Sequence, residues 1–464
     1  MLEPSYNPND MIFKDYMKKQ AILYVPSDTP EAMTMATRRV AGVPMIVRGL
    51  MTLDKAGISN VVLLVAKTQR ATIEHFLTRF KKLPSYEIVE YDEPYVVSKS
   101  IVERVAKDTE DRILLINANL IFEPKLIETI KKTRCNEDEI KICTEGVHPI
   151  PIYEISSLSW KALGDFLSNR PRSLESCLRQ LLEICEHKLV SKPADINTFL
   201  LAHPRDRAVA EKSLAETIRL NIDGPVARHI NKRISLPISL MLSKLWISPN
   251  TITAINIIIG VFSGVFVADG NRYEHILFGA ILFQIASIVD GCDGEVAKLT
   301  FRCTKFGQYA DTICDNLSLG SFLTGLIAGY WRHTHSIVAF TVGALLIFTT
   351  AITFFWMIRF LKNKTNSASL VTFDKEYLRN LKNQPKWLMF LIKYGKYTLK
   401  KDVFSFGFLC FAVFGILYWW LFMATLGTTV AAVILTYLNL QEYFKSVRCK
   451  DSTRDKIKEQ GQTV

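Results

Sequence analysis

The stretch IVDGCDGEVAKLTFRCTKFGQYADTICDN, residues 288–316, carries four aspartates on two neighbouring predicted helices. Asp290 and Asp293 are three positions apart near the end of the first helix. Asp311 and Asp315 are four positions apart at the start of the second. Each spacing places the two side chains of a pair on one helix face. The connection is short, which makes the helices antiparallel neighbours, so the sequence predicts that the two pairs converge.

Four converging carboxylates repel one another unless cations lie between them. Their oxygen atoms suit hard ions such as Mg²⁺, Mn²⁺ or Ca²⁺. The alternative is that the aspartates cap helices or pair with the nearby Lys298, Arg302 and Lys305. Acidic groups at membrane depth are costly and usually functional, which favours a metal site. Glycines at 291, 294 and 307 leave room for a ligand to approach the backbone.

Apolar residues concentrate after position 250, and residues 251–268 carry no charge over a length that can cross a bilayer. The last uncharged run is too long for one crossing, so we divide it near Leu426 and Gly427. An α-helical membrane domain of six spans is predicted, at residues 251–268, 275–297, 312–331, 336–360, 403–421 and 425–443. Within a predicted membrane domain of residues 249–445, the aspartates lie at the ends of the second and third spans. Residues 446–464 are expected to form a cytosolic tail.

The formal net charge of +12 is distributed around the hydrophobic spans. Many of the cations lie between the fourth and fifth spans: Lys362, Lys364, Lys375, Arg379, Lys382, Lys386, Lys393, Lys396, Lys400 and Lys401. This pattern is typical of a cytoplasmic loop that meets anionic lipid or an anionic substrate. The positive-inside rule then predicts a multi-pass protein of the cytoplasmic membrane with its active site facing the cytoplasm. Nucleic acid is not an expected partner, because basic and aromatic residues do not alternate as in such binders.

Residues 223–248 form a basic amphipathic segment directly before the first span. Such a segment is expected to lie in the headgroup layer, bent near Pro237. The alternative is an ordinary linker helix.

Residues 1–222 alternate short apolar runs with amphipathic ones, which predicts a cytosolic α/β domain of the Rossmann-like type. The predicted strands are 21–25, 61–66 and 113–116, and the predicted helices are 39–55, 71–81 and 124–132. Uniformly apolar strands indicate a parallel sheet with helices on both faces. The N-terminal residues have no apolar h-region, so a signal peptide is not expected. The nine cysteines form no CxxC pair and are read as reduced thiols.

The aspartate spacing resembles the signature of the CDP-alcohol phosphotransferases (CDP-alcohol phosphatidyltransferases), DGx2ARx8Gx3Dx3D with a further aspartate three residues upstream. All four aspartates, Gly294 and Gly307 match at the family spacing. One position departs, because Lys298 stands where the family has arginine. Lysine keeps the charge but loses the bidentate fork, so its phosphate contact is expected to differ. The resemblance covers about residues 223–445.

The resemblance implies roles for individual residues. Asp290, Asp293 and Asp311, with Asp315 shared, would hold two divalent ions, Mg²⁺ or Mn²⁺, and Asp315 would be the catalytic base for the acceptor hydroxyl. CDP would contact Asp290, Gly294, Ala297, Lys298 and Gly307. Arg302, Lys305 and Lys401 are candidates for binding substrate phosphate. Homodimers are usual in the family.

The region of residues 40–65 resembles the segment after the glycine-rich loop of sugar-phosphate nucleotidyltransferases. Here the phosphate-binding loop is replaced by a stretch without glycine, residues 26–35. Asn117 and Asn119 occupy the region where that family has a metal-binding aspartate. The domain is therefore interpreted as a degenerate relative without cytidylyl transfer, serving in scaffolding, dimerisation or regulation. Asp195 is either a remnant metal ligand or a surface residue.

The sequence thus predicts metal-dependent transfer of a phosphate-linked group from a CDP-activated donor to an alcohol, with release of CMP. The donor is CDP-diacylglycerol or a CDP-polyol, and the reaction belongs to phospholipid or polyol-phosphodiester synthesis, with membrane lipid as a partner. One alternative is a bifunctional enzyme whose first domain makes the CDP donor from CTP. Another is a cation transporter, which the single cluster of carboxylates disfavours.

Overall fold

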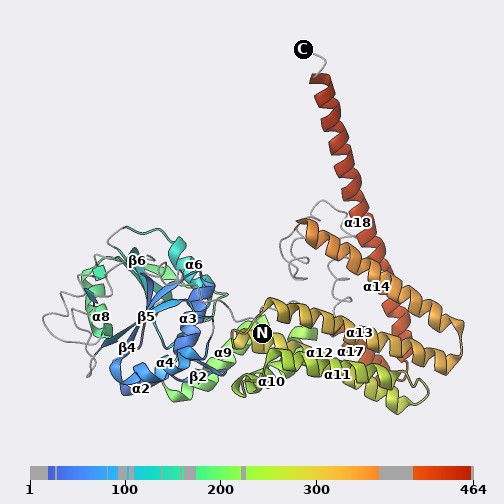
Figure 1. The fold of residues 1–464 in the computed structure, drawn as a ribbon, viewed down its shortest axis with the longest axis horizontal. Helices are drawn as coiled ribbons and strands as arrows, with labels where there is room; N and C mark the ends of the chain where they lie inside the picture. Colours follow the sequence, from blue (N-terminus) through green and yellow to red (C-terminus); the bar gives the residue numbers. More distant parts are fainter. Residues whose placement is uncertain are drawn as a thin grey trace, which may run out of the picture. The chain divides into compact units, whose positions relative to one another are not determined.

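The computed structural model describes residues 19–460 except 27–28, 81, 92–101, 104–108, 137–138, 147, 157–158, 161–173, 221–225 and 365–400. The chain divides into two compact units. Unit 1 contains residues 1–221 together with Leu240–Trp246 and Lys298–Phe301. Unit 2 contains the remaining residues, and most of its described part is helical (Figure 1). Lys375 to Lys400 of the predicted basic loop lie outside the described residues.

Unit 1 is built on a seven-stranded sheet in the order β10-β8-β9-β6-β1-β4-β5. Its strands are β1 (Lys19–Tyr24), β4 (Asn60–Ala66), β5 (Ser85–Tyr91), β6 (Thr109–Asn117), β8 (Ile140–Glu145), β9 (His148–Ser156) and β10 (His187–Ser191). The three predicted strands correspond to β1, β4 and β6, which pair in parallel. The prediction of a wholly parallel sheet is wrong, because β9 is antiparallel to both of its neighbours. β8 and β9 are joined by a tight connection at Gly146 that forms a hairpin, which the apolar pattern alone does not distinguish.

Helices α3 (Met45–Lys55) and α6 (Pro124–Lys132) lie to one side of the strands, with α8 (Leu174–Ile184) on the other (Figure 1). The predicted helix 124–132 is confirmed, and the helix predicted at 71–81 is α4 (Arg70–Thr78). The helix predicted at 39–55 is wrong at its start, where β2 (Arg39–Val40) and β3 (Val43–Pro44) form a small hairpin. Ala41 and Gly42 turn this hairpin with φ values of +47° and +81°, which a helix does not contain.

The remaining elements of unit 1 are short or peripheral. They are α2 (Pro30–Met35), η2 (Lys67–Gln69), β7 (Leu120–Ile121), β11 (Phe199–Leu200), η3 (Pro204–Asp206) and α9 (Arg207–Leu220). The core consists of the apolar strands and the inner faces of the helices, with Ile22, Leu63 and Leu115 fully buried.

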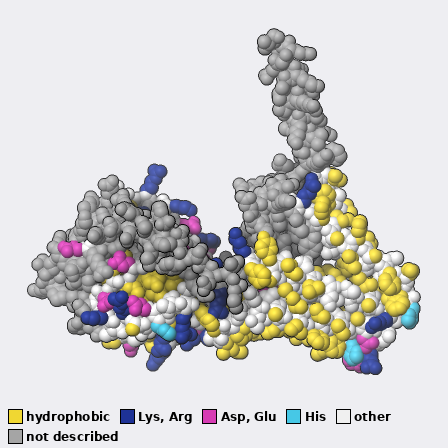
Figure 2. All heavy atoms as spheres, viewed as in Figure 1, with side chains coloured by type: hydrophobic (Ala, Val, Ile, Leu, Met, Phe, Trp, Pro, Cys, Tyr) yellow, Lys and Arg dark blue, Asp and Glu magenta, His cyan; other side chains and the backbone are white. Residues whose placement is uncertain are grey.

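Unit 2 consists of η4 (Ala227–Asn231), α10 (Lys232–Lys244), α11 (Pro249–Val267), α12 (Tyr273–Leu299), α13 (Lys305–Thr334), α14 (Ile337–Lys364), α17 (Lys401–Val413) and α18 (Leu417–Gln460), apart from the end of α10 and residues 298–301. Among the described residues, three helical segments are long and apolar enough to cross a membrane: Pro249–Val267, Tyr273–Leu299 and Leu417–Tyr437. A shorter apolar segment is Ile337–Thr353. Hydrophobic side chains cover much of the visible surface of these helices (Figure 2).

The predicted division between the fifth and sixth spans is wrong. The chain turns at Gly415, which has a φ of +69°, and α18 runs without interruption through Leu426 and Gly427. Gly427 lies within a helix, where a Cβ would meet nothing within 4 Å, so its presence does not mark a turn. α18 continues to Gln460, so the predicted tail from residue 446 begins within this helix.

α11 and α13 pack through glycine and serine residues. A Cβ added to Gly264 would lie 2.4 Å from the Ser321 carbonyl oxygen, and one added to Gly325 would lie 2.0 Å from the Gly264 carbonyl oxygen. Small residues permit such close backbone approach between helices in membranes. This contact fixes α13, which carries two of the aspartates, against α11.

The face of α10 that packs on α12 is polar, and its other face is apolar. Ser235 and Ser239 are fully buried, whereas Ile234, Ile238 and Met241 are 40–59% exposed. An exposed apolar stripe on a helix is suited to a lipid headgroup layer, which is the location predicted for this segment. The helix runs through Pro237.

Candidate active site at the ends of α12 and α13

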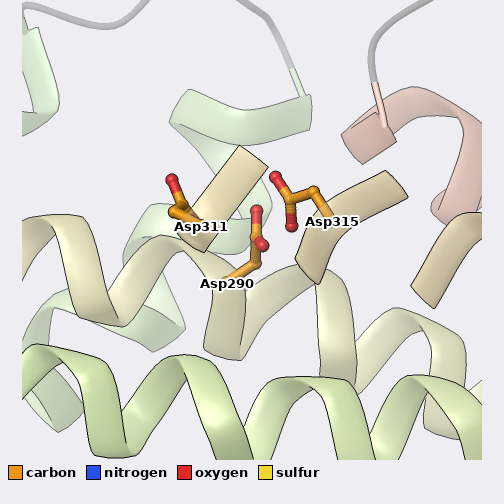
Figure 3. Close-up of side chains that lie close together, drawn as sticks. All are labelled: Asp290, Asp311 and Asp315. Atoms are coloured by element: carbon orange, nitrogen blue, oxygen red, sulfur yellow. The ribbon is translucent and has the colours of Figure 1, made fainter. Parts of the chain in front are cut away.

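Three of the four aspartates form one cluster. Asp290 lies on α12, and Asp311 and Asp315 lie on the first turns of α13. One carboxylate oxygen from each lies within 4.8 Å of the others, and the side chains face a common space (Figure 3). The antiparallel arrangement predicted from the short connection thus brings the two pairs together.

Lys401, the first residue of α17, lies between two of these carboxylates. Its Nζ donates to Asp315 Oδ1 at 2.6 Å and to Asp290 Oδ1 at 3.1 Å. The Lys401 side chain is only 15% exposed, so its charge compensates the acidic groups with little screening by water. Lys401 was predicted as a substrate-phosphate residue, and the structure places it on the carboxylates themselves.

Asp293 is held differently from the other three. Its side chain accepts hydrogen bonds from the Thr253 hydroxyl and from the backbone N–H of Gly294. It is 4% exposed and interacts with the Asp311 carboxyl. Asp293 therefore contacts the acidic site through Asp311. It is not one of the three carboxylates that lie close enough together to bind one ion.

The residues present fit a divalent ion. The cluster is made of oxygen donors, which Mg²⁺ and Mn²⁺ prefer. Asn256 donates through Nδ2 to Asp290 Oδ1 at 2.9 Å, while its buried Oδ1 has no hydrogen-bond partner within the part of the chain that the structure describes. A buried polar oxygen without a partner is costly, and a ligand beside Asp290 would satisfy it.

The predicted CDP-binding positions lie close in sequence to the aspartates of this cluster. Gly294 is exposed, and a Cβ there would meet nothing within 4 Å, which leaves space for a ligand. Gly307 has a different role in the fold, because its N–H donates to Thr304 Oγ1 at 2.9 Å in the N-cap of α13. Ala297 is partly buried, Lys298 and Lys305 are exposed, and Arg302 is partly buried. Gly291, read as ligand space, instead faces Lys232, whose Nζ would lie 2.7 Å from an added Cβ.

Glu295 ties α12 to α10 one turn beyond Asp290. It is 2% exposed, forms an ion pair with Lys232, and accepts hydrogen bonds from Ser235 Oγ at 2.7 Å and Ser239 Oγ at 2.6 Å. The three donors lie on one face of α10, so both carboxylate oxygens are satisfied. This buried group fixes the helix that carries Asp290 and Asp293.

We expect Glu295→Gln to destabilise the protein by about 3 kcal/mol, because Lys232 would remain buried without its counter-charge. The midpoint of thermal unfolding in detergent measures the effect. The double variant Lys232→Met with Glu295→Gln should recover part of the loss, since it removes the unpaired charge. Equal unfolding temperatures for Glu295→Gln and the unchanged protein would contradict this assignment.

The sequence prediction missed Thr253, Asn256 and Glu295. The available signal was the presence of polar residues in an otherwise apolar helix, since Thr253 and Asn256 are three positions apart on one face of α11. Glu295 lies between signature positions and could have been recognised as a buried charge on a predicted span.

Helices that can cross a membrane, together with a partly buried acidic cluster at helix ends, are features of an integral-membrane enzyme. Residues 246–392 match the family described as CDP-alcohol phosphatidyltransferase. Residues 246–392 therefore form a CDP-alcohol phosphatidyltransferase domain, which covers about a third of the chain.

Relatives extend the similarity into unit 1. The chain is 25% identical over 323 residues to a protein of Aquifex aeolicus named "Bifunctional IPC transferase and DIPP synthase", covering 64% of this chain and 72% of that protein. A protein of Archaeoglobus fulgidus with the same name is 24% identical, over 68% of this chain and 66% of its own length. Among solved structures, the inositol-1-phosphate CTP transferase from T. maritima matches with 13% identity and a TM-score of 0.35, covering 44% of this chain and 98% of that one.

Proposed function

We propose that this protein transfers a phosphate-linked group from a CDP-activated donor to an alcohol acceptor in a reaction that requires a divalent cation and releases CMP. The observation that carries the proposal is the cluster of Asp290, Asp311 and Asp315 on helices of a domain that matches the CDP-alcohol phosphatidyltransferase family. Bound Mg²⁺ or Mn²⁺, as two ions, would neutralise charge on the pyrophosphate of the donor.

The chain's own residues have separate tasks in this proposal. Asp290, Asp293 and Asp311, with Asp315 shared, would hold the metal, and Asp315 would accept the proton of the attacking hydroxyl. The open space at Gly294 admits the nucleotide beside Ala297 and Lys298, with Gly307 nearby in the sequence. Lys401 is paired with Asp290 and Asp315, and its positive charge would suit it to bind a substrate phosphate at the same site.

A membrane lipid is proposed as one reactant, and the donor is CDP-diacylglycerol or a CDP-polyol. The apolar stripe of α10 supports a position at the lipid surface. We further propose six membrane spans, with the aspartates and unit 1 facing the cytoplasm, because the basic segments flank that side. The proposed assembly is a homodimer.

The test is a panel of CDP donors and alcohol or phospho-alcohol acceptors, with CMP release and product mass as readouts. We expect one donor and acceptor pair to give CMP only when Mg²⁺ or Mn²⁺ is present. Absence of CMP across the panel, or an equal rate in excess EDTA, would overturn the proposal. Metal flux in proteoliposomes without nucleotide would support the transporter alternative.

The names of the relatives favour a second candidate, in which unit 1 makes the CDP donor from CTP. In unit 1 the carboxyl ends of β1, β4 and β6 meet at one edge, where α/β sheets bind ligands. α2 is fastened at this edge by Asn119 Nδ2, which donates to the Ala32 carbonyl at 2.7 Å, and by Gln69 Nε2, which donates to the Met33 carbonyl at 2.9 Å. A helix attached in this way supports the first reading, that unit 1 does not transfer cytidylyl groups.

We therefore expect the full-length protein to release no pyrophosphate from CTP with any of a panel of sugar and polyol phosphates. The measurement is a coupled pyrophosphate assay with Mg²⁺ present. No release is expected because residues 26–35 contain no glycine, and side chains there would obstruct the backbone approach that a triphosphate needs. An authentic cytidylyltransferase provides the positive control. Release of pyrophosphate with one of these acceptors would establish the bifunctional alternative.

A further inference from the structure

Arg48 is a buried arginine of unit 1 that no step of the proposed reaction uses. It lies on α3, is 4% exposed, and donates through Nη2 to the carbonyl oxygens of Val40 at 2.8 Å and Leu299 at 3.0 Å. Leu299 belongs to the segment Lys298–Phe301, which is part of unit 1 although α12 precedes it. The arginine therefore holds the chain where it leaves the signature helix.

Phe301 strengthens the same attachment. Its ring lies 5.3 Å from the Arg48 guanidinium and 4.6 Å from Lys55 Nζ, which are cation–π distances. The ring packs against the apolar core of unit 1, and the backbone at Phe301 has a φ of +59°. A phenylalanine with a left-handed backbone is strained, and it persists only where its surroundings determine it.

A second segment is attached to unit 1 through Glu211. This buried carboxylate accepts from the Ala41 N–H at 3.2 Å and from Arg207 at 3.1 Å, and it pairs with Lys244 Nζ at 2.6 Å. Lys244 ends α10, which also belongs to unit 1 at Leu240–Trp246. The segment Leu240–Trp246 is therefore attached within unit 1 by Glu211.

Burial of the Arg48 charge has a desolvation penalty, which opposes folding. Its Nε has no hydrogen-bond partner among the described residues, and desolvation by burial lowers the pKa of its guanidinium to about 10, partly offset by Glu211. A hydrophobic side chain of similar size would often be as stable at such a position. Directed hydrogen bonds instead fix one backbone position, that of Leu299.

This position matters because of the order of residues along the chain. Asp290 and Asp293 precede the attached segment, and Asp311 and Asp315 follow it. Only Arg302 and Cys303 separate Phe301 from Thr304, which caps α13 through its bond to the Gly307 N–H. Displacement of Leu299 or Phe301 would be transmitted over a few residues to the helices that carry the two aspartate pairs.

We propose that unit 1 acts as a brace for the metal site, with Arg48 as the positioning residue that fixes the α12–α13 connection and so the separation of the two aspartate pairs. The inference rests on the proposed function for its metal, and it gives a domain without expected cytidylyl transfer a definite role in the reaction of the membrane domain.

The test uses full-length protein in detergent and three variants. Arg48→Met removes the hydrogen bonds to Leu299 while keeping side-chain length, Phe301→Leu removes the ring, and Arg38→Met makes the same chemical change at an exposed position of unit 1. Mn²⁺ binding, followed by electron paramagnetic resonance without nucleotide, is the first readout. We expect Arg48→Met and Phe301→Leu to weaken Mn²⁺ binding about tenfold and Arg38→Met to leave it unchanged.

The second readout separates positioning from a general structural effect. In Arg48→Met, kcat should fall and the Mn²⁺ concentration for half-maximal rate should rise about tenfold, with an unchanged unfolding temperature in the absence of metal. Arg48→Lys, which can still donate to Leu299, should restore part of the affinity. Unchanged Mn²⁺ binding in both Arg48→Met and Phe301→Leu would overturn the brace.

These outcomes distinguish the brace from the proposed function. If the unchanged protein binds Mn²⁺ but releases no CMP from any donor, the proposed function fails, and weaker binding in Arg48→Met still supports the brace. If the unchanged protein releases CMP and Arg48→Met binds Mn²⁺ normally, the proposed function stands and the brace fails.

Discussion

Replacing Asp290 by asparagine is expected to reduce CMP release by at least about 1,000-fold. Asp290 shares its carboxylate between Asn256 and Lys401 and lies within the three-carboxylate cluster, so it is at the centre of the charges that would hold metal. Asparagine keeps the volume and one oxygen but removes the negative charge. The loss should therefore appear in catalysis and in Mn²⁺ binding, while the unfolding temperature changes little.

The matched control for this experiment is Asp195→Asn, the same change at an exposed aspartate of unit 1. It should leave CMP release unchanged, which would also identify Asp195 as a surface residue. Asp315→Asn should lower kcat to a similar extent as Asp290→Asn, with a smaller effect on Mn²⁺ binding if Asp315 chiefly accepts the acceptor proton. CMP release within tenfold of normal in Asp290→Asn would contradict the assigned metal role.

The parts of the site that the sequence predicted are those set by local geometry. The spacing of Asp311 and Asp315 fixes their common face on any helix, and the short connection to Asp290 brings the pairs together. Lys401 lies on α17, 111 residues from its partner Asp290. Asn256 and Thr253 lie on α11, 34 and 40 residues from the aspartates that they contact. Their contacts depend on which helices pack together, and the apolar patterns of these helices do not encode this.

The difference between local and long-range determinants also explains which predictions of the fold were wrong. The helix of residues 124–132 was predicted correctly because proline at its start and its periodicity agree. The hairpin at Ala41 and Gly42 was missed because its tight turn interrupts an apolar run that also has helical spacing. In the last apolar run, Gly415 and Gly427 look alike in sequence, and only Gly415 has a left-handed backbone.

Gly325→Ala is expected to destabilise the membrane domain by about 3 kcal/mol, at the upper end of the usual cost of overpacking. The added methyl group would lie 2.0 Å from the Gly264 carbonyl oxygen, and backbone on both helices cannot move aside as a flexible side chain can. Separation of α11 from α13 would also displace Asp311 and Asp315, which α13 carries, relative to α11. Thermal unfolding in detergent measures the loss of stability. CMP release by the unheated variant measures the effect on the site.

Gly320→Ala provides the control on the same helix, because a Cβ at Gly320 would meet nothing within 4 Å. Alanine has the higher helix propensity, so this variant should be as stable as the unchanged protein or slightly more stable. A difference between the two variants therefore reports the α11–α13 contact rather than the removal of a glycine. If Gly325→Ala matched Gly320→Ala in both stability and CMP release, the close packing of α11 on α13 would not support the site.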